Sequence, residues 1–494
     1  METRIKKVVI AGGGTAGWMA AALLSKTFGK VIDVTLIESE EIGTVGVGEA
    51  TIPPLVKYLR LLGVKEQDFM AATQGTFKLG IQFENWRERN HRYIHSFGTT
   101  GTDHWTAGFQ HFWLRDRARG SAEDYGAYCL ELVAAQQSRF SHLPKQGLNY
   151  AFHIDATLFA GFLRKFSENL GAVRMEGKIV EVDTDPETGF VRSLKLDSGQ
   201  VIEGDLFIDC TGFRGLLIEQ TLHTGYEDWS QWLPCDSAVA MQTGATIEAI
   251  PYTRAIAHGA GWQWRIPLQH RVGNGVVYCS QYMDDHEARA HLLENVAGMR
   301  LTEPRLLKFK TGRRLKTWNK NVVALGLASG FVEPLESTSI HLIQQGIVRL
   351  MQLFPHDGIR QTEIEEYNNQ TQVEIEYIRD FIILHYKVTN RTDTPFWKYC
   401  QALEVPDTLA HRVQLFRDTA RVFRARDDLF QENSWVQVML GQGIVPDEYH
   451  PVADVLSHEE LTRFMATIKS RVDRTVATLP KHEAYVQQYC KAVG

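Results

Sequence analysis

Residues 8–17 read VVIAGGGTAG, and this stretch decides the fold of the chain. The apolar residues before the glycines predict a short buried strand, the glycines predict a tight turn, and helix-forming residues follow over 15–24. A second apolar run, VTLI at 34–37, ends at Glu38. Strand, helix and strand in this order predict the βαβ opening of a Rossmann-type fold.

The glycines have the G-x-G-x-x-G spacing of a dinucleotide-binding turn. The first glycine makes the turn, the second lets a pyrophosphate approach the backbone, and the third lets helix and strand pack closely. Unpaired N–H groups and the helix dipole favour an anion at this helix start, and the acid after the second strand suits ribose hydroxyls. The alternative is a glycine-rich turn without a ligand. The predicted contacts are Gly12, Gly14, Thr15, Ala16, Gly17 and Glu38.

The composition is that of an ordinary globular protein, with 494 residues, 44% hydrophobic, 23% charged and a formal net charge of −6. A mildly acidic chain without a basic run is not expected to bind nucleic acid or an anionic membrane. Six cysteines without metal-ligand spacing predict neither a metal site nor a disulfide framework, so we expect reduced thiols in a cytoplasmic protein. An N-terminal signal peptide is the alternative, but glycines interrupt its apolar run.

The middle of the chain, from about 90 to 270, is rich in aromatic residues and turns and predicts mixed structure. Within it, residues 177–182 and 191–196 flank a turn and predict a hairpin, and the apolar run at 206–209 predicts a further buried strand.

The later part of the chain has helical periodicity. Apolar residues at three- and four-residue spacing predict a helix from Thr338 that Pro355 ends, and a second helix follows. Ser457 with Glu460 forms the capping-box pattern of another helix start. We expect an α/β (α+β) fold: a nucleotide-binding domain over 1–355 with the mixed region inserted, and a helical module over 356–494 packed on it.

Two segments beyond the glycine turn resemble FAD-contacting segments of flavoprotein monooxygenases, Leu206–Gly212 and Gly326–Pro334. The resemblance implies an FAD-binding domain of that kind. No second G-x-G-x-x-G is present for a nicotinamide, so FAD is expected to arrive reduced, as FADH2, from a separate NADH-dependent flavin reductase. The further FAD contacts that we expect are Glu49, Ile179, Asp209, Leu327 and Ile340.

The chain as a whole resembles the flavin-dependent halogenases of the tryptophan-halogenase family. The clearest segment is GWQWRIP at 261–267. The other matching segments are GGGTAGW at 12–18, GVGEATIP at 46–53, FKLGIQFENW at 77–86, 205–216, 326–340, LHYKVTNRTDTPFW at 384–397 and 434–451.

This resemblance implies a mechanism. Reduced FAD and oxygen give a flavin hydroperoxide, which oxidises chloride or bromide to hypohalous acid. The acid passes through the protein to Lys78, which either becomes a haloamine or hydrogen-bonds the oxidant. Burial would have to lower the pKa of this lysine for it to act as a nucleophile. Glu336 then assists halogenation of an electron-rich ring.

The halide is expected at Thr338 and Ser339, where a helix begins and free N–H groups bind anions. In the family the second position is usually glycine, so Ser339 leaves the choice between chloride and bromide open. Trp262 and Trp264 alternate on a predicted strand and therefore point the same way. We expect them to form a wall between substrate and flavin as well as to pack in the core.

The expected substrate contacts are His95 and Phe97, which resemble the family's indole-stacking pair, with Phe430 and Trp435. Arg426 stands where the enzymes for free tryptophan carry an acid that pairs with the substrate ammonium. We therefore expect a small electron-rich aromatic, such as an indole or a phenol, or a larger or peptide-borne ring, in preference to free tryptophan.

Two other functions remain open. A flavin monooxygenase would hydroxylate an aromatic without halide, and a non-catalytic flavin carrier would bind FAD and form no product. A homodimer is also possible from the sequence.

Overall fold

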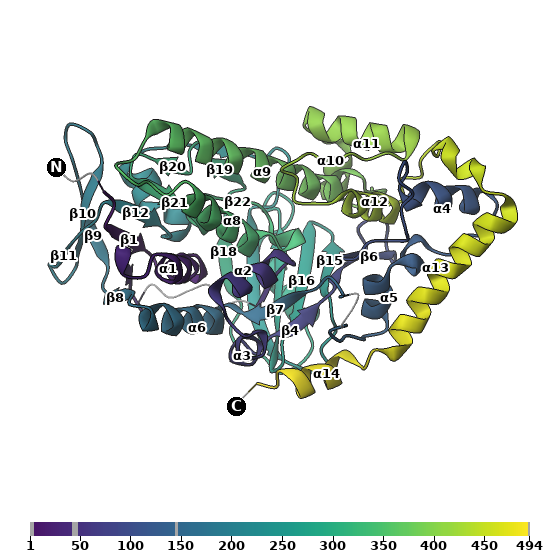
Figure 1. Ribbon diagram of the computed structural model, residues 1–494, viewed down its shortest axis with the longest axis horizontal. Helices are drawn as coiled ribbons and strands as arrows, with labels where there is room; N and C mark the ends of the chain where they lie inside the picture. Colours follow the sequence, from purple (N-terminus) through teal and green to yellow (C-terminus); the bar gives the residue numbers. More distant parts are fainter. Residues whose placement is uncertain (1–3, 42–47, 144–146, 493–494) are drawn as a thin grey trace.

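The computed structural model describes residues 4–41, 48–143 and 147–492. Residues 46 and 47 of the GVGEATIP segment lie outside these ranges. The molecule is elongated, with the N-terminal strands at one end and the long helix α13 (His458–Thr478) along the other (Figure 1).

A six-stranded, mainly parallel sheet forms the N-terminal end of the molecule, in the order β20-β21-β12-β1-β2-β8. The opening strand β1 (Lys7–Ala11) lies between β2 (Asp33–Glu38) and β12 (Leu206–Asp209), parallel to both. The glycine turn leads into α1 (Thr15–Phe28), which confirms the predicted βαβ unit. The outer strands are β8 (Val173–Glu176), β21 (Val322–Ala324) and the antiparallel β20 (Trp318–Asn319).

Strand β1 is buried on both faces, because successive side chains point to opposite sides of a sheet. Val8 and Ile10 pack toward α1, together with α6 (Ala156–Asn169) and α8 (Ser339–Gln352). Val9 and Ala11 pack on the other side, against β10 (Val191–Leu196). A continuous apolar strand is what this arrangement requires.

The centre of the molecule is a seven-stranded sheet in the order β18-β14-β17-β16-β15-β5-β6 (Figure 1). Only β15 and β5 run parallel to one another; the other neighbours are antiparallel. The strands are β5 (Gly80–Glu84), β6 (Arg92–Ser96), β14 (Ser237–Gly244), β15 (Thr253–His258), β16 (Gly261–Pro267), β17 (Arg271–Tyr278) and β18 (Arg305–Lys308).

Three small sheets complete the β structure. The predicted hairpin is present, but it starts at β9 (Ile179–Thr184), because Gly177 has φ +153° and its N–H donates to the Glu38 carbonyl. A second small sheet consists of β3 (Gly48–Ala50), β7 (Ala151–Asp155) and β4 (Thr76–Lys78), and Lys78 is the last residue of β4. The remaining strands are β11 (Val201–Glu203), β13 (Tyr226–Asp228), β19 (Gly312–Arg314) and β22 (Gly330–Phe331).

Helices dominate the chain from α8 onward. Ile340, Ile343, Ile347 and Leu350 form the buried stripe of α8, which ends before Pro355 as predicted. The Ser457–Glu460 capping box at the start of α13 is also confirmed. The other helices here are α9 (Gln361–Lys387), α10 (Pro395–Ala402), α11 (Asp407–Thr419), α12 (Glu432–Gly441) and α14 (His482–Tyr489). Earlier come α2 (Pro54–Leu62), α3 (Glu66–Ala72), α4 (Phe109–Ala118), α5 (Leu130–Gln136) and α7 (Asp285–Glu294).

Two large apolar cores lie side by side. One joins the six-stranded sheet to α1, α6 and α8, and the other joins the seven-stranded sheet to the helices after α8. The boundary at residue 355 stays a prediction.

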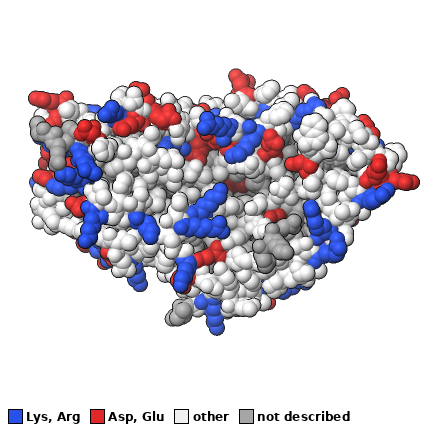
Figure 2. Space-filling model, in the orientation of Figure 1, with Lys and Arg blue, Asp and Glu red and all other residues white. Residues whose placement is uncertain are grey.

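On the face in Figure 2, acidic and basic side chains are intermixed. No helix over the described ranges has the length and apolarity to cross a membrane. In the same ranges no group of three or more His, Cys, Asp or Glu side chains is arranged to hold a metal ion, and all six cysteines are free thiols.

Candidate active site

A cavity of about 1210 Å³ runs from the glycine turn to the seven-stranded sheet. Two glycines of this turn are required, because other backbone atoms approach them closely. A Cβ on Gly12, which has φ +110°, would lie 2.3 Å from the Cys210 carbonyl oxygen, and one on Gly17 would lie 1.9 Å from the Gly12 carbonyl oxygen. Nine predicted cofactor contacts line this cavity: Gly12, Gly14, Thr15, Ala16, Glu38, Glu49, Ile179, Leu327 and Ile340.

Two predicted cofactor residues do not line the cavity. Gly17 packs α1 onto β1 and β2, which is the role expected of the third glycine. Asp209 is fully buried, and its carboxylate accepts hydrogen bonds from the Thr211, Leu217 and Ile218 backbone. It shapes the turn whose next residues, Cys210 and Thr211, face the cavity.

Two acids, Glu38 and Glu49, stand at the cavity wall. Glu38 is held by Arg174 at 2.5 Å and by the indole N–H of Trp18 at 3.3 Å, which fixes its side chain at the end of β2. Burial raises the pKa of Glu49 to about 7. The long cavity, the glycine turn and this polar rim fit an extended dinucleotide.

Trp262 and Trp264 both line the cavity from β16, as their alternation predicted. Their ring centroids are 6.1 Å apart. The ring of Trp264 lies over Gly275, where a Cβ would come within 2.0 Å of it. The indole N–H of Trp262 donates to the Glu333 carboxylate at 2.9 Å. Burial raises the pKa of Glu333 to about 7.

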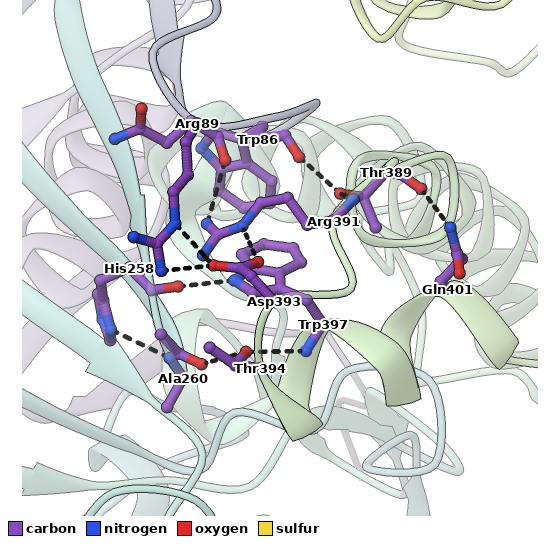
Figure 3. A network of polar contacts seen from close by, with 12 residues as sticks. Trp86, Arg89, His258, Ala260, Thr389, Arg391, Asp393, Thr394, Trp397 and Gln401 are labelled. Carbon is purple, nitrogen blue, oxygen red and sulfur yellow. Dashed lines mark hydrogen bonds and ion pairs between the residues drawn. The ribbon is translucent and has the colours of Figure 1, made fainter.

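A polar cluster fastens the α9–α10 connection to β15 and to the segment after β5 (Figure 3). Arg391 and Arg89 both pair with Asp393, and the Arg391 guanidinium lies 4.6 Å from the Trp397 ring centroid. The Trp397 indole N–H donates to the His258 carbonyl, and the Thr389 hydroxyl donates to the Trp86 carbonyl. The cluster therefore fixes the C-terminal end of α9.

Lys78 ends β4 and is fully buried. Its Nζ donates to the Thr51 carbonyl at 3.0 Å and to the Ser337 hydroxyl at 2.7 Å. Burial lowers the pKa of Lys78 to about 7, against the opposing effect of the Glu336 charge. A neutral amine has two N–H groups and one lone pair, so both N–H groups are used here and the lone pair stays free.

The strand that carries Lys78 is tied to the last helix. The Phe77 N–H donates to Nε2 of His482 at 3.2 Å, and Nδ1 of the same ring contacts the Ala249 carbonyl at 2.7 Å. Phe77 also stacks on Phe140 at a centroid distance of 4.1 Å.

Glu336 lies in the turn before α8 and is 1% exposed. Its Oε2 is 2.9 Å from Nδ1 of His95, and its Oε1 makes a close but bent contact, 2.8 Å, with Nε2 of His385. Burial alone would raise the pKa of Glu336, but the two imidazoles lower it to about 2. The site thus places an ionised carboxylate near an amine that is half neutral at pH 7.

The predicted halide pair lies where α8 begins, next to Glu336. Thr338 is the N-cap residue and is fully buried, and its hydroxyl oxygen has no hydrogen-bond partner among the described residues. Ser339 is the first helical residue and lines the cavity, as does Ser337. Lys78 is not among the lining residues, so Ser337 forms the partition between cavity and amine.

Three predicted substrate residues, His95, Phe97 and Phe430, lie around Lys78 and Glu336. The Phe97 ring centroid is 5.2 Å from Lys78 Nζ, and the His95 ring is 6.1 Å from Phe430. Trp435 stands one layer further back: it has no exposed surface and packs between Phe381 and the Arg412 guanidinium. Contact between Trp435 and a substrate would require its neighbours to move.

Sequence reasoning missed three partners of Lys78 and Glu336, namely Thr51, Ser337 and His385, and also Tyr93, which contacts His385. Thr51 contacts Lys78 through its backbone carbonyl, and Ser337 has a positive φ of +61°. A residue pattern shows neither feature. His385 stands in the LHYK segment, which was noted as a match without a role.

Comparison with known proteins identifies the family of this chain. The sequence profile described as tryptophan halogenase matches residues 7–458. The tryptophan 6-halogenase of Streptomyces toxytricini is 35% identical, over 97% of each chain. A flavin-dependent halogenase from Xanthomonas campestris has a solved structure that is 59% identical, with a TM-score of 0.98 over 99% of each chain. Another, from Brevundimonas sp. BAL3, is 44% identical, with a TM-score of 0.95 over 99% of this chain and 100% of its own.

Proposed function

Because this chain belongs to the tryptophan halogenase family, whose members are flavin-dependent enzymes, we propose that it transfers chloride or bromide to an electron-rich aromatic ring. The observation that carries this proposal is the buried amine of Lys78, whose pKa is lowered. This amine donates to Ser337, the residue that directly follows the ionised Glu336.

FAD would lie in the long cavity, with its pyrophosphate at the start of α1 and its ring system toward Trp262 and Trp264. When bound and reduced, FAD would supply, together with oxygen, the oxidising chemistry that converts halide to hypohalous acid. The electrons come from a separate NADH-dependent flavin reductase, since the chain has no second dinucleotide motif. The free thiols fit a reducing, cytoplasmic setting.

The halide is held at the start of α8. Two features support this position: the unpaired N–H groups of the helix start, and the buried Thr338 hydroxyl without a partner. Ser339 faces the cavity beside it.

Lys78 receives the oxidised halogen. Its free lone pair attacks the halogen of hypohalous acid, a nitrogen–halogen bond forms, and the released hydroxide takes one amine proton to become water. The halogen then passes to a ring carbon, whose proton is lost. The net change is one hydrogen on the ring replaced by halogen, with hypohalous acid converted to water.

Glu336 stabilises the positive charge that develops on the ring. A carboxylate with a pKa of about 2 is a weak base, so electrostatic stabilisation is its main effect, and fixed charges of this kind commonly contribute roughly 10²–10³ in rate. His95 and Phe97 bound the ring position.

The substrate is an indole-type or phenolic ring in preference to free tryptophan. The relative from Streptomyces toxytricini is described as acting on tryptophan. In this chain Arg426 is exposed on the loop before Phe430 and offers no anion for a substrate ammonium. A larger or peptide-borne ring is the alternative substrate.

The test is incubation of the protein with FAD, a flavin reductase, NADH and either bromide or chloride, over a panel of indoles, phenols and free tryptophan. Mass spectrometry of the products decides. Halogenated rings that depend on halide support the proposal. Hydroxylated rings formed without halide would make the protein a monooxygenase, and FAD binding without any product would make it a carrier.

A further inference from the structure

A third side chain is linked to the Glu336–His385 contact. Tyr93, on the edge strand β6, places its hydroxyl 3.0 Å from Nδ1 of His385, whose Nε2 contacts Glu336 at 2.8 Å. The three side chains come from β6, α9 and the turn before α8, so the link joins three separate parts of the fold.

The protonation of this link follows from its acceptors. An ionised carboxylate has no hydrogen to donate, so the 2.8 Å contact, although bent, favours a hydrogen on Nε2 of His385. Burial lowers the pKa of His385, which favours the neutral ring. A neutral ring has one N–H, so Nδ1 is an acceptor and the Tyr93 hydroxyl donates to it.

The ring of Phe83 holds both members in place. It stacks on Tyr93 at 5.0 Å with an interplanar angle of 8°, and on His385 at 4.4 Å with 14°. His385 lies in the last turn of α9, two residues before its end at Lys387, and the Arg391–Asp393 cluster in Figure 3 fixes the chain just beyond it. Neither ring is free to turn.

We propose that Tyr93 and His385 are positioning residues for halogenation: the Tyr93 hydroxyl selects the His385 tautomer whose Nε2–H faces Glu336, and so keeps that carboxylate ionised and aimed. This inference rests on the proposed function.

Three titratable groups face His385 or its partner: Glu336, His95 and Tyr93. The charge of Glu336 also acts on Lys78. The other neighbours, Phe83, Trp86 and Phe381, do not titrate. Loss of His385 removes the imidazole that lies 2.8 Å from Oε1 of the buried Glu336 and lowers its pKa, so the pKa of the carboxyl group would rise.

The pH dependence of kcat/KM distinguishes a positioning role of Tyr93 and His385 from a purely structural role. Deprotonation of Lys78 alone gives log kcat/KM a slope of about one below pH 7 in the wild type, whereas a second proton taken up by Glu336 in the same range makes the slope about two. We expect the steeper limb in Tyr93→Phe and His385→Phe, with a loss of about tenfold at pH 7. His385→Gln keeps a donor toward Glu336 and should restore most of the rate.

A double-variant cycle tests whether the effect runs through Glu336. In the Glu336→Gln background, His385→Phe should cost less than about twofold, because the group on which it acts is already changed. An equal loss in both backgrounds, or an unchanged slope in the single variants, would overturn the proposal. Tyr58→Phe is the matched control, since its buried hydroxyl donates to the Met19 carbonyl, far from this link.

A measurement without substrate keeps this inference separable from the proposed function. In protein labelled with ¹⁵N-histidine, the His385 signal, assigned by its loss in His385→Gln, should show the Nε2–H tautomer. Tyr93→Phe should shift it toward Nδ1–H. A wild type already in the Nδ1–H form would overturn the tautomer step, whereas a correct tautomer in a protein that halogenates nothing would refute only the proposed function.

Discussion

Nζ of Lys78 lies 2.7 Å from the hydroxyl oxygen of Ser337, the residue that directly follows Glu336. One residue therefore sets the separation of amine and carboxylate. Ser337 has φ +61°, a conformation that the turn before α8 imposes on it. The same residue lines the cofactor cavity, so it touches both compartments of the proposed reaction.

Replacing Lys78 with alanine or arginine should abolish halogenation and leave FAD binding intact. Alanine removes the nitrogen, and an arginine is always protonated and has no free lone pair. Product analysis by mass spectrometry and FAD titration by fluorescence measure the two properties. Lys195→Ala, at an exposed ion pair with Glu181, is the control. Halogenation by either Lys78 variant would remove this residue from the mechanism.

Lys78 should also make the stability of the protein depend on pH. Its pKa is about 7 in the folded protein and about 10.5 in the unfolded chain, so only the unfolded chain binds the proton between these values. Stability therefore rises with pH across this window, and the cost of Lys78, on the order of 5 kcal/mol, is greatest below pH 7. Lys78→Met should raise Tm more at about pH 6 than at about pH 10, as calorimetry can measure. An equal gain at both values would contradict the lowered pKa.

Glu336→Gln should lower kcat by roughly 10²-fold, because the amide keeps the shape of the carboxyl group and loses its charge. Single-turnover halogenation measures this loss apart from product release. Glu84→Gln changes an acid that pairs with Arg254 away from the site, and it should retain the wild-type rate. A Glu336→Gln enzyme of normal rate would mean that no charge is needed at this position.

Gly12→Ala should prevent FAD binding. The new Cβ would lie 2.3 Å from a backbone oxygen at a φ that alanine rarely adopts. Gly161→Ala in α6 has nothing within 4 Å and should bind FAD normally, with a stability gain of roughly 0.5–1 kcal/mol. Fluorescence titration and thermal unfolding of both variants give the comparison, and tight FAD binding by Gly12→Ala would exclude the turn as the pyrophosphate site.

Trp262→Ala should raise the ratio of hydroxylated to halogenated product. Removing the ring opens the cavity wall, and Trp262→Phe should retain most of the wall while losing the hydrogen bond to Glu333. Products from matched reactions give the ratio by mass spectrometry. An unchanged ratio in Trp262→Ala would leave this tryptophan a purely packing residue.

The sequence predicted the parts of the fold that depend on local patterns. The βαβ unit follows from the run at 8–17, α8 from its apolar stripe, and the start of α13 from Ser457 and Glu460. The seven-stranded sheet was not predicted, because it pairs β5 with β15, about 170 residues later. Pairing over such a separation produces no local sequence pattern.

At the site, residue types that stand out chemically were predictable, whereas their partners were not. Lys78 and Glu336 were expected, but the sequence gives no sign that two imidazoles share one carboxylate. The surroundings of Asp209 were unpredictable for a related reason: a carboxylate after a strand can face a ligand or its own backbone, and here the next turn provides four donors.

The hydrogen bond from Phe77 to His482 has a consequence for synthesis of the protein. The segment with the reactive lysine is synthesised well before its support in α14, because Phe77 and His482 are 405 residues apart in the chain. A nascent chain can therefore build its nucleotide-binding end first, and it completes the surroundings of the amine only after α14 has emerged.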